Sequence, residues 1–144
     1  MSTNQKSATV LHTSQVRVRF YDTDLSTTTF FTNHIKWFDS IAIIDFLRSR
    51  GVVWSELLEN NVDVAVATVS FDYMTPIFLD DLLDVTVEGV KIGNKSIRFN
   101  GGIYKQDTGE PVGRGSVVYV FVDKNARSAV PVPDNVRQKL NITP

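Results

Sequence analysis

Residues 34–51, with the sequence HIKWFDSIAIIDFLRSRG, are the segment that most constrains the fold of this chain. Apolar side chains recur in it at helical spacing, and their apolar neighbours widen the stripe until it covers most of the helix surface. A helix that is apolar on most sides must be surrounded by other elements of the fold. The pattern therefore predicts a central helix, capped at its start by Thr32 or Asn33 and ended by Gly51.

The segments on either side of this helix have the patterns of strands. Residues 15–24 alternate apolar and polar side chains, as a half-buried strand does. The pair Gly101-Gly102 predicts a bulge or bend, and the Pro-led segment at 131–140 predicts a short terminal helix. After a short amphipathic stretch, the remaining predicted strands follow at residues 63–77, 80–92, 96–106 and 112–123.

One strand, one long helix and four consecutive strands indicate an α+β fold, in which one face of an antiparallel sheet packs on the helix. The length of 144 residues fits a single domain. We expect this domain to span residues 15–144, after a loose N-terminal tail at residues 1–14 that is rich in polar side chains.

The composition excludes several functional classes. Fifteen Lys and Arg residues against sixteen Asp and Glu residues give a net charge of -1, whereas a general nucleic-acid or anionic-membrane binder needs a basic surplus. Without cysteine the chain has no disulfide, thiolate nucleophile or Cys-ligated metal site, and its two histidines leave little for zinc. No apolar run approaches the length of a membrane span, and the first fourteen residues lack the apolar core of a signal peptide. We therefore expect a soluble, cytoplasmic protein without a metal or other cofactor.

The triplet Asp22-Thr23-Asp24 lies between the first predicted strand and the central helix. Such a triplet is typical of a turn. A carboxylate that leaves a strand can also face the start of the next helix, where free backbone N–H groups stabilise a carbonyl oxygen that becomes negative. This pair of features suffices for ester or thioester hydrolysis without Ser, Cys or metal. The carboxylate would either attack the carbonyl directly or act as a general base on water, and both routes stay open.

The stretch VRFYDTDLSTTTFFTNHIKWFD, residues 18–39, resembles the signature of the 4-hydroxybenzoyl-CoA thioesterase family. Residues 69–99 resemble that family's Tyr-x-x-Pro and Asp-Asp strand pair, and residues 113–140 resemble its closing strand and Pro-led helix. The resemblance covers residues 15–140. It implies a hotdog fold, a long central helix wrapped by a five-stranded antiparallel sheet. It also implies homodimers, often paired into homotetramers, with active sites at the dimer interface.

The family's functional residues can be carried over to matching positions. Its catalytic carboxylate falls on Asp24, and its oxyanion donor, a backbone amide at the helix start, falls near Phe31. Its basic residues that bind coenzyme A fall on Lys91, Lys95 and Arg98, around the hairpin that follows the third strand. A solvated hairpin tip is the alternative interpretation of these three residues.

The chain departs from the family pattern close to the expected site. Residues 25–28, Leu-Ser-Thr-Thr, replace the usual small residues, so the loop after Asp24 should be stiffer and tighter. His34 replaces a pocket tyrosine, which makes it a candidate substrate contact. Phe30 adds apolar surface beside Phe31, consistent with an acyl pocket and equally with core packing.

The resemblance implies an acyl-CoA thioesterase, which converts acyl-CoA and water into a carboxylic acid and free CoA. The balanced charge predicts no nucleic-acid or membrane partner. Other functions stay open because hotdog domains carry several chemistries. The thioester could be held by an acyl-carrier protein, or the reaction could be a hydration with His34 as base. The domain could also bind acyl-CoA without catalysis.

Overall fold

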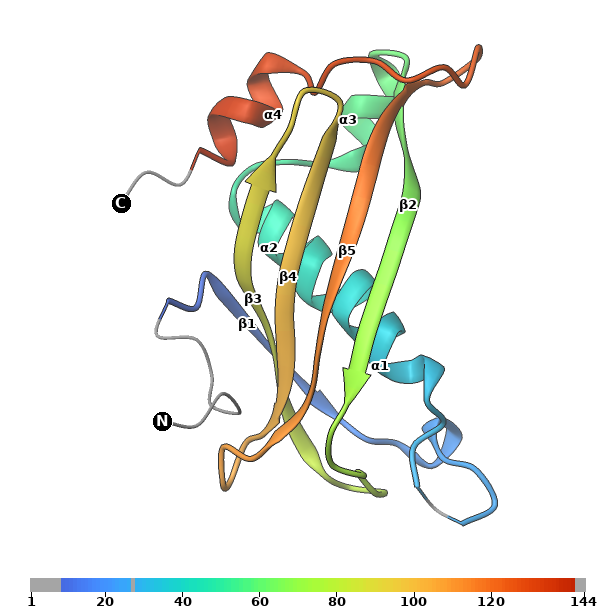
Figure 1. Cartoon of the computed structure of the whole chain (residues 1–144), viewed down its shortest axis with the longest axis vertical. Coiled ribbons are helices and arrows are strands. Elements are labelled where there is room, and N and C mark those ends of the chain that lie inside the picture. Colours follow the sequence, from blue (N-terminus) through green and yellow to red (C-terminus); the bar gives the residue numbers. More distant parts are fainter. Residues whose placement is uncertain (1–8, 27, 142–144) are drawn as a thin grey trace.

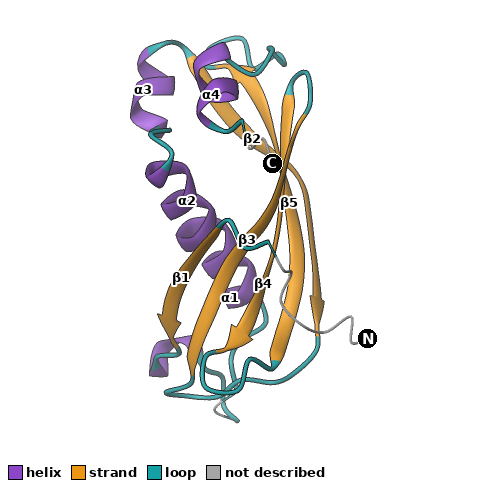
Figure 2. Cartoon of the chain, turned by 90° about the vertical axis from the view of Figure 1, so that its left-hand side faces the viewer, coloured by secondary structure: helices purple, strands orange, loops and turns teal. Residues whose placement is uncertain are grey.

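The computed structural model describes residues 9–26 and 28–141 of the chain. Five strands form one antiparallel sheet in the order β1-β3-β4-β5-β2, and a long helix lies against one face of it (Figures 1 and 2). This arrangement confirms the predicted α+β hotdog fold. The strands are β1 (His12–Arg17), β2 (Val62–Tyr73), β3 (Leu82–Ile92), β4 (Ser96–Lys105) and β5 (Pro111–Asp123).

The central helix is continuous from residue 32 to residue 49. It consists of α1 (Thr32–Lys36), a π-helical stretch (Trp37–Ile43) and α2 (Ile44–Ser49). A π-helical stretch widens the helix locally and is frequent at functional sites. The helix buries its apolar side chains against the helix-facing side of the sheet, as the all-round apolar pattern predicts; the largest buried side chains there include Phe38, Ile43, Phe46, Phe99 and Phe121.

The two ends of the central helix differ in how well the sequence predicts them. Gly51 has a φ of +80°, the left-handed conformation expected of a glycine that ends a helix. The predicted caps at the other end are wrong: Thr32 is the first helical residue, Phe31 precedes it, and no side chain caps the helix. The Asn33 side chain instead donates to the Asp22 carbonyl oxygen over 2.8 Å, because that segment packs beside the helix start.

The first strand is shorter than its sequence pattern. β1 begins at His12 and ends at Arg17, and a single 3-10 turn (Phe20–Asp22) follows. The expected tail at residues 1–14 therefore extends too far, since the His12 ring packs 6.3 Å from the ring of Phe46. Residues 1–8 lie outside the described residues.

The predicted irregularity near Gly101-Gly102 lies on the neighbouring strand. The register between β3 and β4 shifts between Val87 and Gly89, directly opposite these glycines. Gly101 itself sits beneath the central helix: a Cβ atom there would be 2.5 Å from the ring of Phe38 and 1.9 Å from the Thr86 carbonyl oxygen. The glycine is thus required for the close approach of helix and sheet.

Two short helices, α3 (Trp54–Glu59) and α4 (Asp134–Lys139), lie at the end of the sheet that also carries the β3–β4 hairpin (Figure 1). Residues 20–26 and 28–31 lie at the other end. Within the described part of the chain, no helix has the length and apolarity needed to cross a membrane.

Candidate active site

The segment between β1 and the central helix closes on itself. The Phe30 amide donates to the Asp22 carbonyl oxygen over 2.9 Å, and the Asp24 amide donates to the Thr28 carbonyl oxygen over 2.9 Å. An isolated antiparallel bridge joins Thr23 to Thr29 between these two bonds. The segment is therefore a narrow, hairpin-like loop tied to the helix start, and its residue 27 lies outside the described residues.

The two carboxylates of the Asp-Thr-Asp triplet have different environments. Asp22 is only 3% exposed; its Oδ2 accepts the Arg19 amide over 2.9 Å, and its Oδ1 lies 3.7 Å from Lys36 Nζ. Because β1 ends at Arg17, the strand does not continue far enough to place Asp22 and Asp24 on one face. Asp22 therefore holds the turn together, whereas Asp24 takes no part in these contacts.

Asp24 lies exposed near the tip of the loop. Its carboxylate accepts the Ser26 hydroxyl over 2.7 Å, the Ser26 amide over 2.8 Å and the Thr28 hydroxyl over 3.2 Å. These bonds, with the Ser26 hydroxyl first, hold the pKa of Asp24 below its ordinary value of 3.8. The carboxylate is therefore ionised at neutral pH, as both a nucleophile and a general base must be.

Phe31 stands at the start of the central helix, with helical angles of φ -60° and ψ -28°. Its carbonyl oxygen accepts the Tyr73 hydroxyl over 2.6 Å and lies 3.2 Å from His34 Nδ1. A carbonyl oxygen can only accept, so Nδ1 is the ring nitrogen that carries the proton. Among the described residues, no acceptor is found for the Phe31 amide. Amides at a helix start favour a negatively charged oxygen.

His34 is buried within a cluster of aromatic side chains. It is 4% exposed, and its ring centroid lies 5.8 Å from Trp37, 5.6 Å from Phe71 and 4.8 Å from Tyr73. Burial lowers the pKa of His34 below its ordinary value of 6.5, so the ring is neutral at pH 7.

Phe30 and Phe31 form the apolar surface beside the loop. Their ring centroids lie 5.1 Å apart, and both side chains are exposed. This excludes the alternative that the two rings belong to the core of the single chain.

Three basic residues of the predicted site lie together but far from Asp24 in the fold. Lys91 in β3 pairs directly with Arg98 in β4, and Lys95 lies in the turn between these strands. The Arg98 guanidinium donates to the Ser116 hydroxyl over 3.3 Å. Their hairpin and the Asp24 loop occupy opposite ends of the sheet (Figure 1). One chain therefore groups the three cations without bringing them to the carboxylate.

Tyr73, the last residue of β2, also lies at this site, although it is not among the residues predicted from the sequence. Its hydroxyl contacts Phe31, and its ring packs 4.9 Å from Phe71. The Tyr-x-x-Pro pattern at residues 73–76 is the sequence feature that could have indicated this tyrosine, because it places Tyr73 at the end of a strand.

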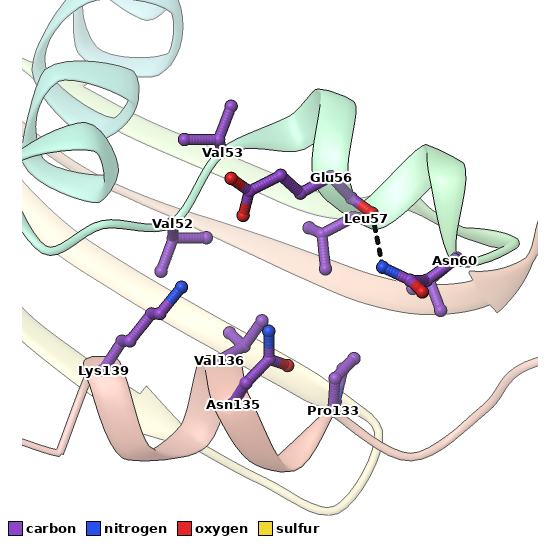
Figure 3. A pocket seen from close by; sticks show the side chains of 10 residues that line it. Val52, Val53, Glu56, Leu57, Asn60, Pro133, Asn135, Val136 and Lys139 are labelled. Carbon is purple, nitrogen blue, oxygen red and sulfur yellow. Dashed lines mark hydrogen bonds between the residues drawn. The ribbon is translucent and has the colours of Figure 1, made fainter.

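A cavity of about 250 Å³ lies between α3 and α4 (Figure 3). Apolar side chains, among them Val52, Leu57 and Val136, line it together with the charged side chains of Glu56 and Lys139. It is at the opposite end of the sheet from Asp24 and contains none of the predicted site residues. In the described ranges, no group of three or more His, Asp or Glu side chains is placed to hold a metal ion.

Residues 18–140 match the family model of the thioesterase-like superfamily. A protein of Aquifex aeolicus named as a candidate esterase is 28% identical over 91 residues, which are 63% of this chain and 70% of that protein. The superfamily match confirms the family resemblance at that level. Membership of the 4-hydroxybenzoyl-CoA thioesterase family within it stays a prediction.

Two solved thioesterase structures are similar to this chain. A 1,4-dihydroxy-2-naphthoyl-CoA thioesterase from Synechocystis superimposes with a TM-score of 0.83 at 16% identity, over 90% of this chain and 94% of that one. A gentisyl-coenzyme A thioesterase superimposes with a TM-score of 0.77 at 23% identity, over 88% of this chain and 98% of that one. At these identities the likeness establishes a shared fold.

Proposed function

Because this chain belongs to the thioesterase-like superfamily, we propose that it is an acyl-CoA thioesterase that releases a carboxylic acid and free CoA. The observation that carries the proposal is that Asp24 and Phe31 lie on the same short segment before the central helix. An ionised carboxylate and an amide without an acceptor among the described residues lie on one short loop, which backbone hydrogen bonds tie to the helix start. The carboxylate supplies the attacking group, and the amide stabilises the oxyanion.

Two reaction routes start from this arrangement. In one, an Asp24 oxygen attacks the thioester carbonyl, the thiolate of CoA leaves, and water then hydrolyses the mixed anhydride. In the other, Asp24 takes a proton from a water molecule that attacks the carbonyl. Both develop negative charge on the carbonyl oxygen, which the Phe31 amide would stabilise. A hydration with His34 as base has less support, because that ring is buried and its Nδ1 is engaged with the Phe31 carbonyl.

We propose that a second copy of the chain completes the site. β2 forms one edge of the sheet, and its helix-facing Val66 and Val69 are exposed, Val66 by 55%. An exposed apolar edge strand of this length is a template for pairing. A two-fold axis makes the two copies of β2 antiparallel and turns the partner end for end. The partner's basic hairpin then comes to the end of the sheet that holds this chain's Asp24.

The proposed substrates are aromatic acyl-CoA thioesters. The similar structures named above act on 1,4-dihydroxy-2-naphthoyl-CoA and gentisyl-CoA, which carry aromatic acyl groups. The exposed rings of Phe30 and Phe31 offer faces and edges on which an aromatic acyl group can pack. The phosphates of CoA would lie on the partner's basic hairpin, in either a homodimer or a homotetramer built from that dimer.

The reaction is tested by thiol release from a panel of aromatic and aliphatic acyl-CoAs, with acyl-carrier-protein thioesters beside them. We compare the wild type with Asp24→Asn and with Asp107→Asn, which alters an exposed carboxylate in the β4–β5 turn. Asp24→Asn should lower kcat by about 100-fold or more and leave the oligomer intact. Full activity in this variant would remove Asp24 from the mechanism. A wild type that is stabilised by acyl-CoA but releases no thiol would be a binding domain.

The shared site is tested by subunit complementation. One chain carries Asp24→Asn, and the other carries Lys91→Gln, Lys95→Gln and Arg98→Gln. In a mixed dimer with a shared site, one of the two sites keeps both wild-type halves, so co-expression should restore about a quarter of the wild-type kcat/KM. A site contained within one chain predicts no recovery, because each chain of the mixed dimer lacks one half.

A further inference from the structure

We propose that Tyr73 is a positioning residue, which holds the oxyanion site in place through its hydrogen bond to the Phe31 carbonyl. The inference rests on the proposed function, since it concerns the amide that would stabilise the oxyanion. Tyr73 is the last residue of β2, and it reaches from the sheet to the helix start over a 2.6 Å bond between its hydroxyl and the carbonyl oxygen. Burial raises the pKa of Tyr73, so the phenol stays protonated and donates.

A contact from outside the helix can steady the start of the central helix, because no side-chain capping bond secures it. No side chain caps α1, and the side-chain amide of Asn33 donates instead to the Asp22 carbonyl oxygen. In a helix the carbonyl of a residue points toward the C-terminus and its amide toward the N-terminus. The Phe31 carbonyl and amide belong to adjacent peptide planes, which are joined by the helical angles of Phe31 (φ -60° and ψ -28°). Donors that hold the carbonyl in this conformation therefore help to keep the amide pointing out of the helix start.

The hydroxyl of Tyr73 can be separated from its ring. The ring packs on His34 and Phe71, with centroid distances of 4.8 and 4.9 Å, and Tyr73→Phe keeps these contacts. The side chain is 46% exposed in the single chain, so loss of the hydroxyl leaves no cavity within the chain itself. The Phe31 carbonyl keeps His34 Nδ1 as a weaker contact at 3.2 Å. The variant therefore removes one positioning bond and little else.

The experiment compares the wild type with Tyr73→Phe and with Tyr21→Phe. Tyr21 is a matched control, since it lies in the segment before the same loop and its side chain is 82% exposed. We measure kcat and KM on the best acyl-CoA of the panel and, without substrate, the backbone carbonyl ¹³C chemical shift of Phe31. Loss of a hydrogen-bond donor moves that shift upfield. Tyr73→Phe should show this change and a fall in kcat of about fivefold to twentyfold, with KM altered by less than about twofold. Tyr21→Phe should change neither.

Each outcome decides a different point. An unchanged carbonyl shift in Tyr73→Phe would show that the bond does not act on Phe31, and would overturn the proposal. A changed shift with an unchanged kcat would also overturn it, because the bond would then be structural only. A wild type that hydrolyses no acyl thioester would overturn the proposed function, and the positioning role with it, whatever the carbonyl shift shows.

Discussion

The substitution Gly101→Ala tests how closely the central helix must approach the sheet. The added Cβ atom would lie 1.9 Å from the Thr86 carbonyl oxygen and 2.5 Å from the ring of Phe38. Non-bonded heavy atoms pack well only from about 3.5 Å, so the neighbouring strand would have to move by roughly 1.5 Å and the Phe38 ring by roughly 1 Å. The nearest atom belongs to the backbone, and it cannot rotate away as a side chain does.

The magnitude follows from this geometry. Overpacking a core costs about 1–3 kcal/mol, and the upper end applies where backbone must shift. We therefore expect Gly101→Ala to lower the free energy of unfolding by about 3 kcal/mol. In a chain of this size that loss lowers the melting temperature by about 10 °C.

Urea denaturation followed by tryptophan fluorescence measures this loss. Gly89→Ala is the matched control, because Gly89 lies on the adjacent strand and its added Cβ would meet only the Asn100 side chain, at 3.4 Å. We expect this control to change stability by less than about 0.5 kcal/mol. Adding Phe38→Leu to Gly101→Ala should recover little, since the Thr86 carbonyl remains. Equal midpoints for the two alanine variants would refute the reasoning.

Two further predictions concern buried polar groups. Because burial lowers the pKa of His34 below 6.5, the unfolded chain binds a proton below that pH that the folded chain resists, and the free energy of unfolding should fall as the pH drops from 6.5. Urea titrations across this pH window should show a smaller fall in the free energy of unfolding for His34→Phe than for the wild type. The control His12→Gln keeps the buried His34 ring and should behave as the wild type does. The Tyr104 hydroxyl donates to the buried Glu88 carboxylate over 2.8 Å, so Tyr104→Phe should cost about 1.5–3 kcal/mol. Thermal unfolding checks this prediction by comparing Tyr104→Phe with the control Tyr21→Phe, which alters an exposed phenol. Equal melting temperatures for the two variants would contradict the prediction.

The central helix and the five strands could be predicted because burial of an apolar stripe leaves a local period in the sequence. The ends of these elements could not. Asn33 has the chemistry of a helix cap, yet its side chain bonds the Asp22 carbonyl, a tertiary contact that no local pattern encodes. His12 lies in an N-terminal segment that is rich in polar residues and resembles a tail, but its ring packs on Phe46, which is distant in sequence.

The candidate site could be predicted one residue at a time, but its grouping depends on strand order. In an antiparallel sheet, successive hairpins fall at opposite ends, so the β3–β4 turn with Lys95 lies away from the loop with Asp24. Motif spacing contains no information on which ends coincide. A site that uses both groups must draw them from two chains, and the exposed edge strand β2 supplies a symmetry that would bring them together. If the proposed shared site exists, the active unit contains at least two chains, and complementation between two inactive variants is the sharpest test of it.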